Sequence, residues 1–367
     1  MVNMRCFVAT ALALTGAAYA APVVSDSDRF TFLNMPTPLG LPCDLAVGPD
    51  NMIYTNYLLA NKIVQINPTT NAIKEFDIPF TLPLLSNLSL PVYGGVAFAP
   101  CVVRPGQDGN MYAATGLRNQ LAKLDLATGV VSVFTPPNAL QPVGNLQLLN
   151  DMWGGPEDMF LSQSTADVIS AFNYKTHQWR TYQVPTPGSN PFGMRYASDG
   201  ALWFTETLGQ KIGRLNTTTG VIQEFPVPFP TVATPAVLRV ETGGDMLWFT
   251  CFVSDSVAGI NMYTHNFTNY RNTAFGSAVS VPSVNTLDAQ NNIWFSTWTQ
   301  NLLTYFPPAT GKMTHIEIPR TLIYTPISVP FEMNVGVQYY GGEGKNRIYF
   351  TQSIFNRVGY YDLDAGQ

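Results

Sequence analysis

The chain has 367 residues, of which 46% are hydrophobic and only 12% are charged, and its formal net charge is −5. This low Lys and Arg content excludes a broad basic surface of the kind that attracts nucleic acid or an anionic membrane. The 29 Gly and 28 Pro residues indicate a turn-rich globular protein that is long enough to bury one large core.

The first 20 residues predict a secretory signal peptide. An apolar run from Phe7 to Ala18 follows a weakly basic start, and Ala18-Tyr19-Ala20 fits a small-x-small cleavage site. The run is too short to span a bilayer. We therefore expect a secreted or secretory-lumen protein in which residues 21–367 form a single domain. Candidate glycosylation sequons, which agree with export, occur at Asn87, Asn216 and Asn266.

A phrase of three short strands returns seven times along the rest of the chain. Its clearest copy, Ala201 to Pro228, reads ALWFTETLGQKIGRLNTTTGVIQEFPVP. The copies begin in chain order at Met52, Met111, Met159, Ala201, Met246, Asn292 and Arg347. A unit of this size cannot bury its apolar face alone, so neighbouring copies must stack.

A fourth strand precedes each phrase. In PFGMRYASDGALWF the turn Ser198-Asp199-Gly200 joins two apolar runs, which is a strong hairpin signal. Because four antiparallel strands form one blade, we predict an all-β fold, a seven-bladed β-propeller. The last copy ends at Asp364 without an outer strand, and Arg29 to Pro36 carries the missing pattern. We expect this N-terminal segment to complete the seventh blade, because ring closure removes exposed sheet edges.

Two residue types have structural interpretations. The aromatics that recur at one blade position predict inter-blade packing rather than a ligand cage. They are Tyr54, Tyr112, Trp203, Trp248, Trp294 and Tyr349. Three cysteines remain after the signal peptide, so at least one is unpaired or bonded to another chain. A bridge between Cys43 and Cys101 and buried free thiols are both compatible with the spacing.

The phrase SDGALWFTETLGQKIGRLNTTTGVIQEFPVP resembles the repeat of the virginiamycin B lyase (streptogramin lyase) family of seven-bladed propellers. The likeness is close in the fourth copy and looser in the others. It implies a lyase that opens a macrocyclic depsipeptide at its ester by elimination. It also implies Mg²⁺, a His general base where an innermost strand begins, and acidic residues near the metal. Such a base removes the acidic proton, and the cation stabilises the enolate.

The sequence departs from that pattern at the base. The residues after the Pro that opens an innermost strand are Cys43, Phe192, Ala236, Ser283 and Phe331. The three histidines, His177, His265 and His315, fall in turns or outer strands, far from the predicted channel. We therefore expect a divergent secreted member of fungal type that lacks the family's catalytic His.

Candidate site residues follow from the blade geometry. Innermost strands begin at the same end of a blade as second strands finish, so both places meet at one mouth of the channel. The carboxylates there are candidate acid–base catalysts: Glu206, Glu332, Asp151 and Asp44. Candidate substrate contacts are Trp153, Asn285, Tyr93, Trp298 and Gln352. Glu206, which matches the Glu of the family's FTE phrase, and Glu332 are also candidate ligands for Mg²⁺ or Ca²⁺.

Two classes of function remain open. The first is a lyase-like or cyclase-like enzyme that opens or closes a ring of a small cyclic or oxygenated natural product, in secondary-metabolite or mycotoxin metabolism. The second is a non-catalytic extracellular propeller that binds a ligand or host protein, as a virulence or colonisation factor. The acidic, amide-rich channel mouth favours the first class, and the missing His favours the second. Both predict a small-molecule or protein ligand, no nucleic acid and no membrane span.

Overall fold

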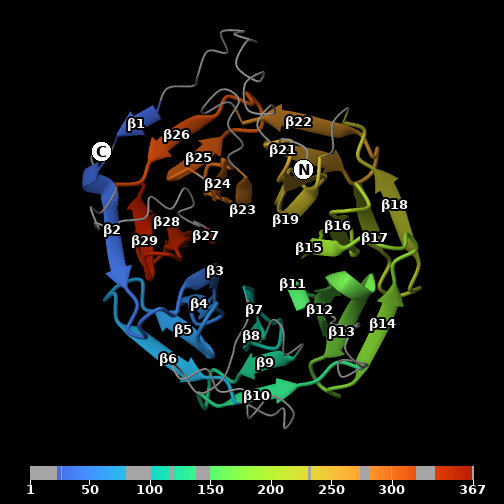
Figure 1. Ribbon diagram of the computed structural model, residues 1–367, viewed down its shortest axis with the longest axis horizontal. Coiled ribbons are helices and arrows are strands. Elements are labelled where there is room, and N and C mark those ends of the chain that lie inside the picture. Colours follow the sequence, from blue (N-terminus) through green and yellow to red (C-terminus); the bar gives the residue numbers. More distant parts are fainter. Residues whose placement is uncertain are drawn as a thin grey trace, which may run out of the picture.

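The computed structural model is a ring of seven antiparallel sheets around a central channel (Figure 1). It describes residues 23–25, 27–79, 101–115, 120–137, 149–229, 233–272, 281–298, 300–319 and 335–365. Two short 3-10 turns, Ser27–Arg29 and Ser164–Ala166, interrupt the strands of this part. The predicted all-β, seven-bladed propeller is confirmed. In the described part of the chain, no helix is long and apolar enough to span a membrane.

In every blade the strands lie side by side, ordered from the channel to the outside of the ring (Figure 1). The first three blades are β3–β6 (Pro42–Val47, Ile53–Tyr57, Lys62–Ile66, Ile73–Asp77), β7–β10 (Val103–Pro105, Met111–Ala114, Leu121–Leu124, Val131–Phe134) and β11–β14 (Leu149–Gly154, Asp158–Gln163, Val168–Asn173, Trp179–Gln183). The next three are β15–β18 (Pro191–Tyr196, Leu202–Glu206, Lys211–Leu215, Ile222–Pro226), β19–β22 (Pro235–Thr242, Met246–Cys251, Ser256–Asn261, Phe267–Arg271) and β23–β26 (Pro282–Leu287, Ile293–Thr297, Leu302–Phe306, Thr314–Glu317). The seventh contains β27–β29 (Val337–Gly342, Lys345–Gln352, Arg357–Asp362).

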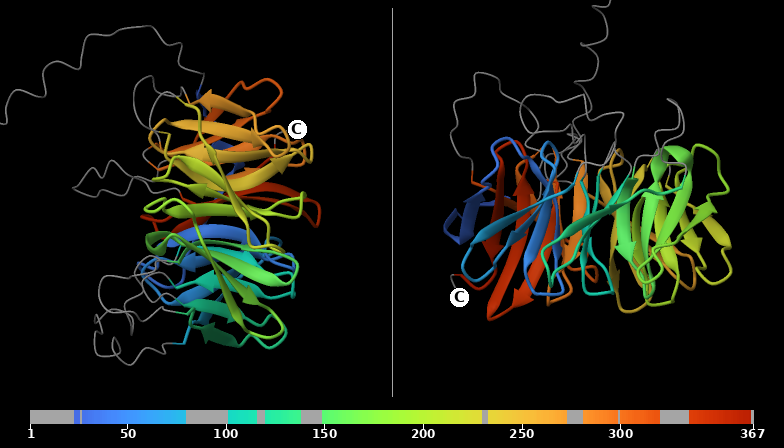
Figure 2. Two further views of the ribbon diagram at one scale, coloured as in Figure 1. Left: turned by 90° about the vertical axis from the view of Figure 1, so that its right-hand side faces the viewer. Right: turned by 90° about the horizontal axis from the view of Figure 1, so that it is seen from below.

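Edge-on views show a disc whose thickness follows the length of the strands (Figure 2). The innermost strands all run in the same direction through this disc. We term the end of the channel at which they begin the leading end, and the end at which they finish the trailing end. The candidate catalytic residues were placed by the sequence at the leading end.

The first strands of the chain close the ring. β2 (Phe30–Asn34) pairs antiparallel with β29, with Phe30 opposite Tyr361. This confirms the predicted outer strand of the seventh blade. β1 (Val23–Ser25) was not predicted, and it pairs in parallel with β26 as a fifth strand of the sixth blade. The beginning of the chain therefore spans the junction between blades six and seven (Figure 1).

The recurring aromatics are buried in the blade interfaces, as predicted. Their polar atoms bond to a turn of the same blade. The hydroxyl of Tyr54 donates to Asp50 at 2.7 Å. Nε1 of Trp294 donates to Asp288, also at 2.7 Å. A ring that is buried and anchored in this way stabilises the blade and is not free to bind a ligand.

A Thr at one strand position joins blade four to blade five and blade seven to blade one. Thr205 accepts the N–H of Gly193 at 3.0 Å and donates to the carbonyl of Ala236 in the following blade at 2.6 Å. Thr351 likewise donates to the carbonyl of Cys43 at 2.7 Å. The backbones approach so closely that a Cβ on Gly193 would lie 2.3 Å from the Ala236 oxygen. The FT pair of the repeated phrase therefore encodes the contact between blades.

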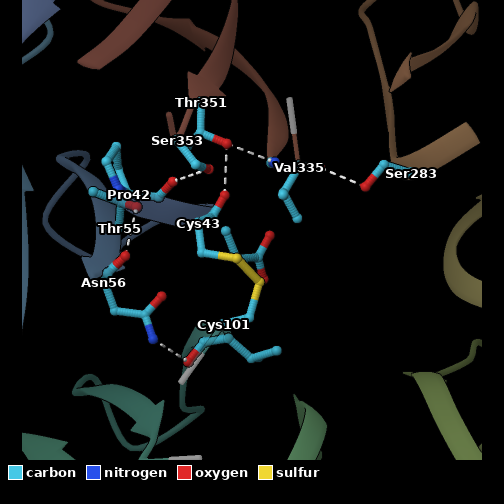
Figure 3. The surroundings of a disulfide bond; sticks show 12 residues. Pro42, Cys43, Thr55, Asn56, Cys101, Ser283, Val335, Thr351 and Ser353 are labelled. Carbon is cyan, nitrogen blue, oxygen red and sulfur yellow. Dashed lines mark hydrogen bonds between the residues drawn. A yellow bond between two sulfur atoms is a disulfide. The ribbon is translucent and has the colours of Figure 1, made fainter. Parts of the chain in front are cut away.

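A disulfide joins Cys43, in β3, to Cys101, just before β7 (Figure 3). Of the two alternatives that the sequence left open, the bridge is therefore the one present, and Cys251 is a buried free thiol. The bridge links the innermost strands of the first two blades. Hydroxyl groups tie the same region to the seventh blade, since Ser353 donates to the carbonyl of Pro42 at 2.5 Å (Figure 3).

Candidate functional site

The channel wall near the trailing end is formed by one repeated position. On each innermost strand, this is the residue that pairs with the recurring aromatic, as Arg195 pairs with Trp203. The residues at this position are Ala46, Arg104, Trp153, Arg195, Thr286 and Gln338, and in the fifth blade the bulge places Arg239 there. All seven line a cavity of about 410 Å³.

A buried ion-pair network crosses the channel. Nη1 and Nη2 of Arg239 donate to the two carboxylate oxygens of Asp44 at 2.8 and 3.0 Å. Nη2 also donates to Asp151 at 3.1 Å. Nη2 of Arg104 lies 2.9 Å from the second oxygen of Asp44. Each member is at most 8% exposed, and the four belong to the innermost strands of blades one, two, three and five.

The strands themselves position the two aspartates. Asp44 and Asp151 occupy equivalent bulges, where the pairing of β3 and β11 with their neighbours shifts. Each Oδ1 accepts the N–H of the next residue, at 2.8 Å for Asp44 and 2.9 Å for Asp151. Both carboxylates thus point at the arginines. Because guanidinium groups neutralise them, neither Asp44 nor Asp151 is a free base in this arrangement.

Two candidate substrate contacts line the cavity above this network. The ring centroid of Trp153 lies 5.1 Å from the Cζ of Arg195 and 5.8 Å from that of Arg104, within cation–π range. Nδ2 of Asn285 donates to the carbonyl of Val237 at 3.1 Å, while its Oδ1 has no partner. The structure therefore brings Trp153 and Asn285 together with Asp44 and Asp151, on the trailing side of the channel.

Glu206 lies apart from them, at the leading end of β16. It pairs with Pro191 and is fully buried, and its carboxyl group lies within hydrogen-bonding reach of Glu224 and Ser189. Burial raises the pKa of Glu206 to about 8, and the neighbouring Glu224 carboxylate adds to the rise. The charge of Lys211 opposes it, but its Nζ is bonded to Glu224 at 2.7 Å. Glu206 is therefore largely protonated at neutral pH.

The first blade shows what Glu206 replaces. There, the hydroxyl of Tyr57 occupies the same strand position and donates to Glu75 at 2.6 Å. In both blades the outer-strand carboxylate accepts from a Thr, and Thr186 donates to Glu224 at 2.8 Å. This Glu–Thr pair is thus part of the blade scaffold. Glu206 is what distinguishes the fourth blade from the first, because it places a second carboxyl group where the first blade has a phenol.

The leading end of blades four to six is apolar. Phe192 and Phe252 pack against buried Val237 and Val284, and their ring centroids are 6.1 Å apart. The candidate substrate contact Trp298 extends this set, with its ring 5.7 Å from that of Phe252. Its Nε1 donates to a hydroxyl of the same blade. An apolar lining with one buried carboxyl nearby is the usual composition of a small-molecule site.

The remaining candidates are not brought to this place. Gln352 is buried in the seventh blade. Its Nε2 donates to Oδ1 of Asn301 at 3.1 Å, and its Oε1 accepts a hydrogen bond from Nε of Arg357 at 2.6 Å. Glu332, Tyr93 and Asn87 lie outside the described residues. Asn266 is exposed in a turn, and Oδ1 of Asn216 accepts two backbone N–H groups of its own turn.

The described residues do not fit a bound Mg²⁺ or Ca²⁺ ion. Among them, no group of three His, Cys, Asp or Glu side chains is placed to hold a metal. Asp44 and Asp151 bind arginines, and a protonated Glu206 is a weak ligand for a hard cation. We therefore derive no step through a metal ion from these residues.

The three histidines lie away from the channel. His177 and His265 occupy exposed turns before outer strands, and His265 stacks on Phe225 with centroids 4.2 Å apart. His315 lies in β26, where burial lowers its pKa to about 4. Its Nδ1 is 2.9 Å from the hydroxyl of Thr304. The sequence predicted His315 in an outer strand. Its burial was not predicted, because it results from the pairing of β1 with that strand.

The arginines of the channel were not predicted from the sequence. The predicted site residues come from the leading end of the blades, whereas the arginines occupy the position opposite the recurring aromatic. Read in each copy, that position gives Arg104, Arg195 and, with the bulge, Arg239. This pattern was available in the sequence.

Together, the seven blades and the channel that they enclose define a seven-bladed β-propeller. Residues 100–365 match the model of the Virginiamycin B lyase family, so the chain belongs to that family. Among proteins with curated descriptions, no sequence matches it.

Solved structures of lyases share the fold. Virginiamycin B lyase from Staphylococcus aureus is 20% identical, with a TM-score of 0.74 over 91% of this chain and 99% of that one. A catalytically inactive variant of that enzyme, solved with quinupristin, is 20% identical, with a TM-score of 0.73 over the same shares of the two chains. A streptogramin B lyase is 21% identical, with a TM-score of 0.72 over 90% of this chain and 96% of that one.

Proposed function

We propose that this protein is a secreted lyase-like propeller that acts on a small cyclic or oxygenated natural product at the leading end of its channel. A carboxyl group, rather than a histidine, would supply the base. The observation that carries this proposal is the fully buried carboxyl group of Glu206, which lies next to the carboxyl group of Glu224 and whose pKa is raised to about 8. Strongly shifted carboxyls are typical of acid–base catalysts.

The proposed step is an elimination. Deprotonated Glu206 takes the acidic proton from the carbon next to a carbonyl, and that C–H electron pair forms a carbon–carbon double bond. The C–O bond on the neighbouring carbon breaks, so the ring ester leaves as a carboxylate and the proton stays on Glu206. Because its pKa lies near 8, ionised Glu206 is a stronger base than an ordinary carboxylate at a pH where much of it is charged.

The surroundings of Glu206 suit a bulky, largely apolar substrate. Phe192 directly follows Pro191, the strand partner of Glu206, and it belongs to the apolar set with Phe252 and Trp298. The turn at Gly209 lies against the carboxyl, since a Cβ on Gly209 would lie 3.1 Å from Oε2. A ligand that displaces this turn would reach the proton-accepting oxygen.

Secretion is supported by the chemistry of the chain. A disulfide such as Cys43–Cys101 persists in oxidising compartments and is rare in the cytosol. The sequon residue Asn266 is exposed, as glycosylation requires. Both agree with the predicted signal peptide and with a role in secondary-metabolite or toxin chemistry outside the cytosol.

The test is turnover of a panel of macrocyclic depsipeptides and lactones by the protein without residues 1–20. Ring opening by elimination gives a product of unchanged mass, whereas hydrolysis adds one water, so mass spectrometry separates the two. We expect Glu206→Gln to reduce the rate by about a hundredfold or more. The exposed Glu157→Gln is the matched control and should keep the rate. Full activity of Glu206→Gln would refute the role of this carboxyl.

A second candidate function is a non-catalytic extracellular propeller that binds a ligand or a host protein, as a virulence or colonisation factor. It is favoured by the histidines, all of which lie away from the channel, and by the arginines that neutralise Asp44 and Asp151. Saturable binding of a panel member in calorimetry, without conversion at any pH, would support this function over the first.

A further inference from the structure

The cavity at the trailing end lies on the opposite side of the ion-pair network from the leading end. Its volume is about 410 Å³, which is enough for a small organic molecule. Three arginines, Arg104, Arg195 and Arg239, line it together with Trp153 and Asn285. The reaction proposed for Glu206 uses none of these residues.

The positive and negative charges around the cavity are equal in number, but their side chains differ in exposure. Arg104, Arg195 and Arg239 face three acids, Asp44, Asp151 and Glu241, so the sum is neutral. The carboxylates are withdrawn: the side chains of Asp44, Asp151 and Glu241 are 1%, 2% and 8% exposed. The side chain of Arg195 is 25% exposed. A molecule in the cavity therefore meets a cation first.

Arg195 is held in place by two hydrogen bonds, and its Nη2 remains free to donate. Its Nε donates to Glu241 at 3.1 Å, and its Nη1 donates to the carbonyl of Arg239 at 2.7 Å. Its guanidinium also lies over the ring of Trp153. Nη2 makes no hydrogen bond within the described part of the chain. A fixed guanidinium with a free N–H group is preorganised to bind a carboxylate.

The floor of the cavity contains further unpartnered groups. Nε of Arg104, Nε of Arg239 and Oδ1 of Asn285 have no hydrogen-bond partner among the described residues. All three side chains are more than nine-tenths buried. A buried polar atom without a partner costs about 1–3 kcal/mol, and native proteins contain few of them. These atoms lie beneath the surface of the cavity, so a ligand would reach them only after their side chains turn toward it.

We propose that the trailing end of the channel binds a small organic monocarboxylate. Its carboxylate would accept hydrogen bonds from Nη2 of Arg195, which is the donor that the other contacts of this side chain leave free. A dianion fits less well than a monoanion, because the acids of the cavity already balance its arginines and each added negative charge takes the site further from neutrality. This site is independent of the proposed reaction at Glu206.

The experiment measures binding of benzoate to the full mature chain by calorimetry, with benzamide as its uncharged analogue of the same shape. We expect saturable benzoate binding, and binding of benzamide that is weaker by about tenfold or more, because the charged hydrogen bond is lost. Arg195→Gln should weaken benzoate binding to a similar degree, whereas Arg195→Lys should retain part of it. Arg180→Gln, at an exposed arginine of an outer strand, is the matched control.

Each outcome is decisive for the site. Equal affinity for benzoate and benzamide, or an unchanged benzoate affinity in Arg195→Gln, would overturn the proposal. Absence of saturable benzoate binding would also overturn it and leave a cavity that holds water only. Thermal unfolding of the folded variants, measured without ligand, separates loss of binding from loss of structure. Glu206→Gln should leave benzoate binding unchanged, so failure of the proposed reaction and failure of this site are distinguishable.

Discussion

Arg239 and Asp44 lie on opposite sides of the channel and form a two-pronged ion pair, with N–O distances of 2.8 and 3.0 Å. They belong to blades five and one, which are not neighbours in a ring of seven. Beyond their own blades, the hydroxyls of Thr205 and Thr351 bond only to the next blade. This ion pair therefore ties the ring across its diameter, with Asp151 and Arg104 as additional partners.

Loss of this cross-channel pair should be costly. Asp44→Asn leaves two buried guanidinium groups without their shared carboxylate, and we expect the free energy of unfolding to fall by about 3–5 kcal/mol. Asp151→Asn should cost less, because Asp151 has only one arginine partner. Urea unfolding measures both, with the exposed Glu157→Gln as control. An equal loss for Asp44→Asn and Asp151→Asn would contradict the ranking.

Glu206 should make stability depend on pH. Its pKa rises from the model-compound value of 4.5 to about 8, so the folded state favours the neutral form. This contribution is fully present below pH 4.5 and is lost as pH rises through 8, a loss on the order of 4–5 kcal/mol. Glu206→Gln removes it. We expect the variant and the parent to unfold at similar temperatures at pH 4, and the variant to be more stable at pH 9. Parallel curves would disprove the shift.

The same pKa predicts the pH dependence of the proposed reaction. A base must be ionised, so the rate of elimination should rise through an apparent pKa of about 8. Initial rates between pH 6 and 9, at subsaturating substrate, measure it. A rate that falls over this range would show that the group acts as an acid or that another residue is the base.

The disulfide should contribute measurably to stability. Cys43 and Cys101 are separated by 58 residues, so the bridge restricts a long loop in the unfolded chain. Replacing both with Ala should lower the free energy of unfolding by about 2–4 kcal/mol. Alkylation of unfolded residues 21–367 without reductant should label only Cys251. Labelling of Cys43 or Cys101 under that condition would show that the bridge is absent.

The N-terminal strands should differ in importance. Deletion of residues 21–34 removes β2 and leaves the edge of β29 unpaired, so we expect association of chains through that edge. Deletion of residues 21–25 removes only β1, which lies outside the four strands of blade six, and should leave the particle monodisperse. Light scattering compares the two. Equal behaviour of the two deletions would show that β2 is dispensable for closure.

Most of the fold could be predicted because the repeated phrase encodes the strands and turns of a blade. Trp203, Thr205 and the turn at Asp199 each have a scaffold role that recurs in other blades, so repetition revealed the architecture. β1 could not be found this way, because Val23–Ser25 carries none of the phrase. A segment that occurs once gives no periodic signal.

The candidate site could be predicted only in part. The equivalence of Asp44 and Asp151 was visible, but their pairing with Arg239 was not, because a repeat defines neighbours and not the blades that face each other. The protonation of Glu206 was also hidden, since it depends on burial and on Glu224 in a different strand. Position within a blade can thus be read from the sequence, whereas charge state requires the packed ring.

The pairing of β2 with β29 also sets the order in which this protein can fold. Phe30 leaves the ribosome before the strands of blades one to six and Tyr361 leaves it after them, yet the two residues lie opposite each other in one sheet. Blades one to five consist of consecutive strands and can form as they are synthesised. The seventh must wait for the synthesis of β29, and contacts between distant segments form slowly. Until then β2 and β29 each have an unpaired edge, so the interval before closure is when the protein most needs protection from aggregation.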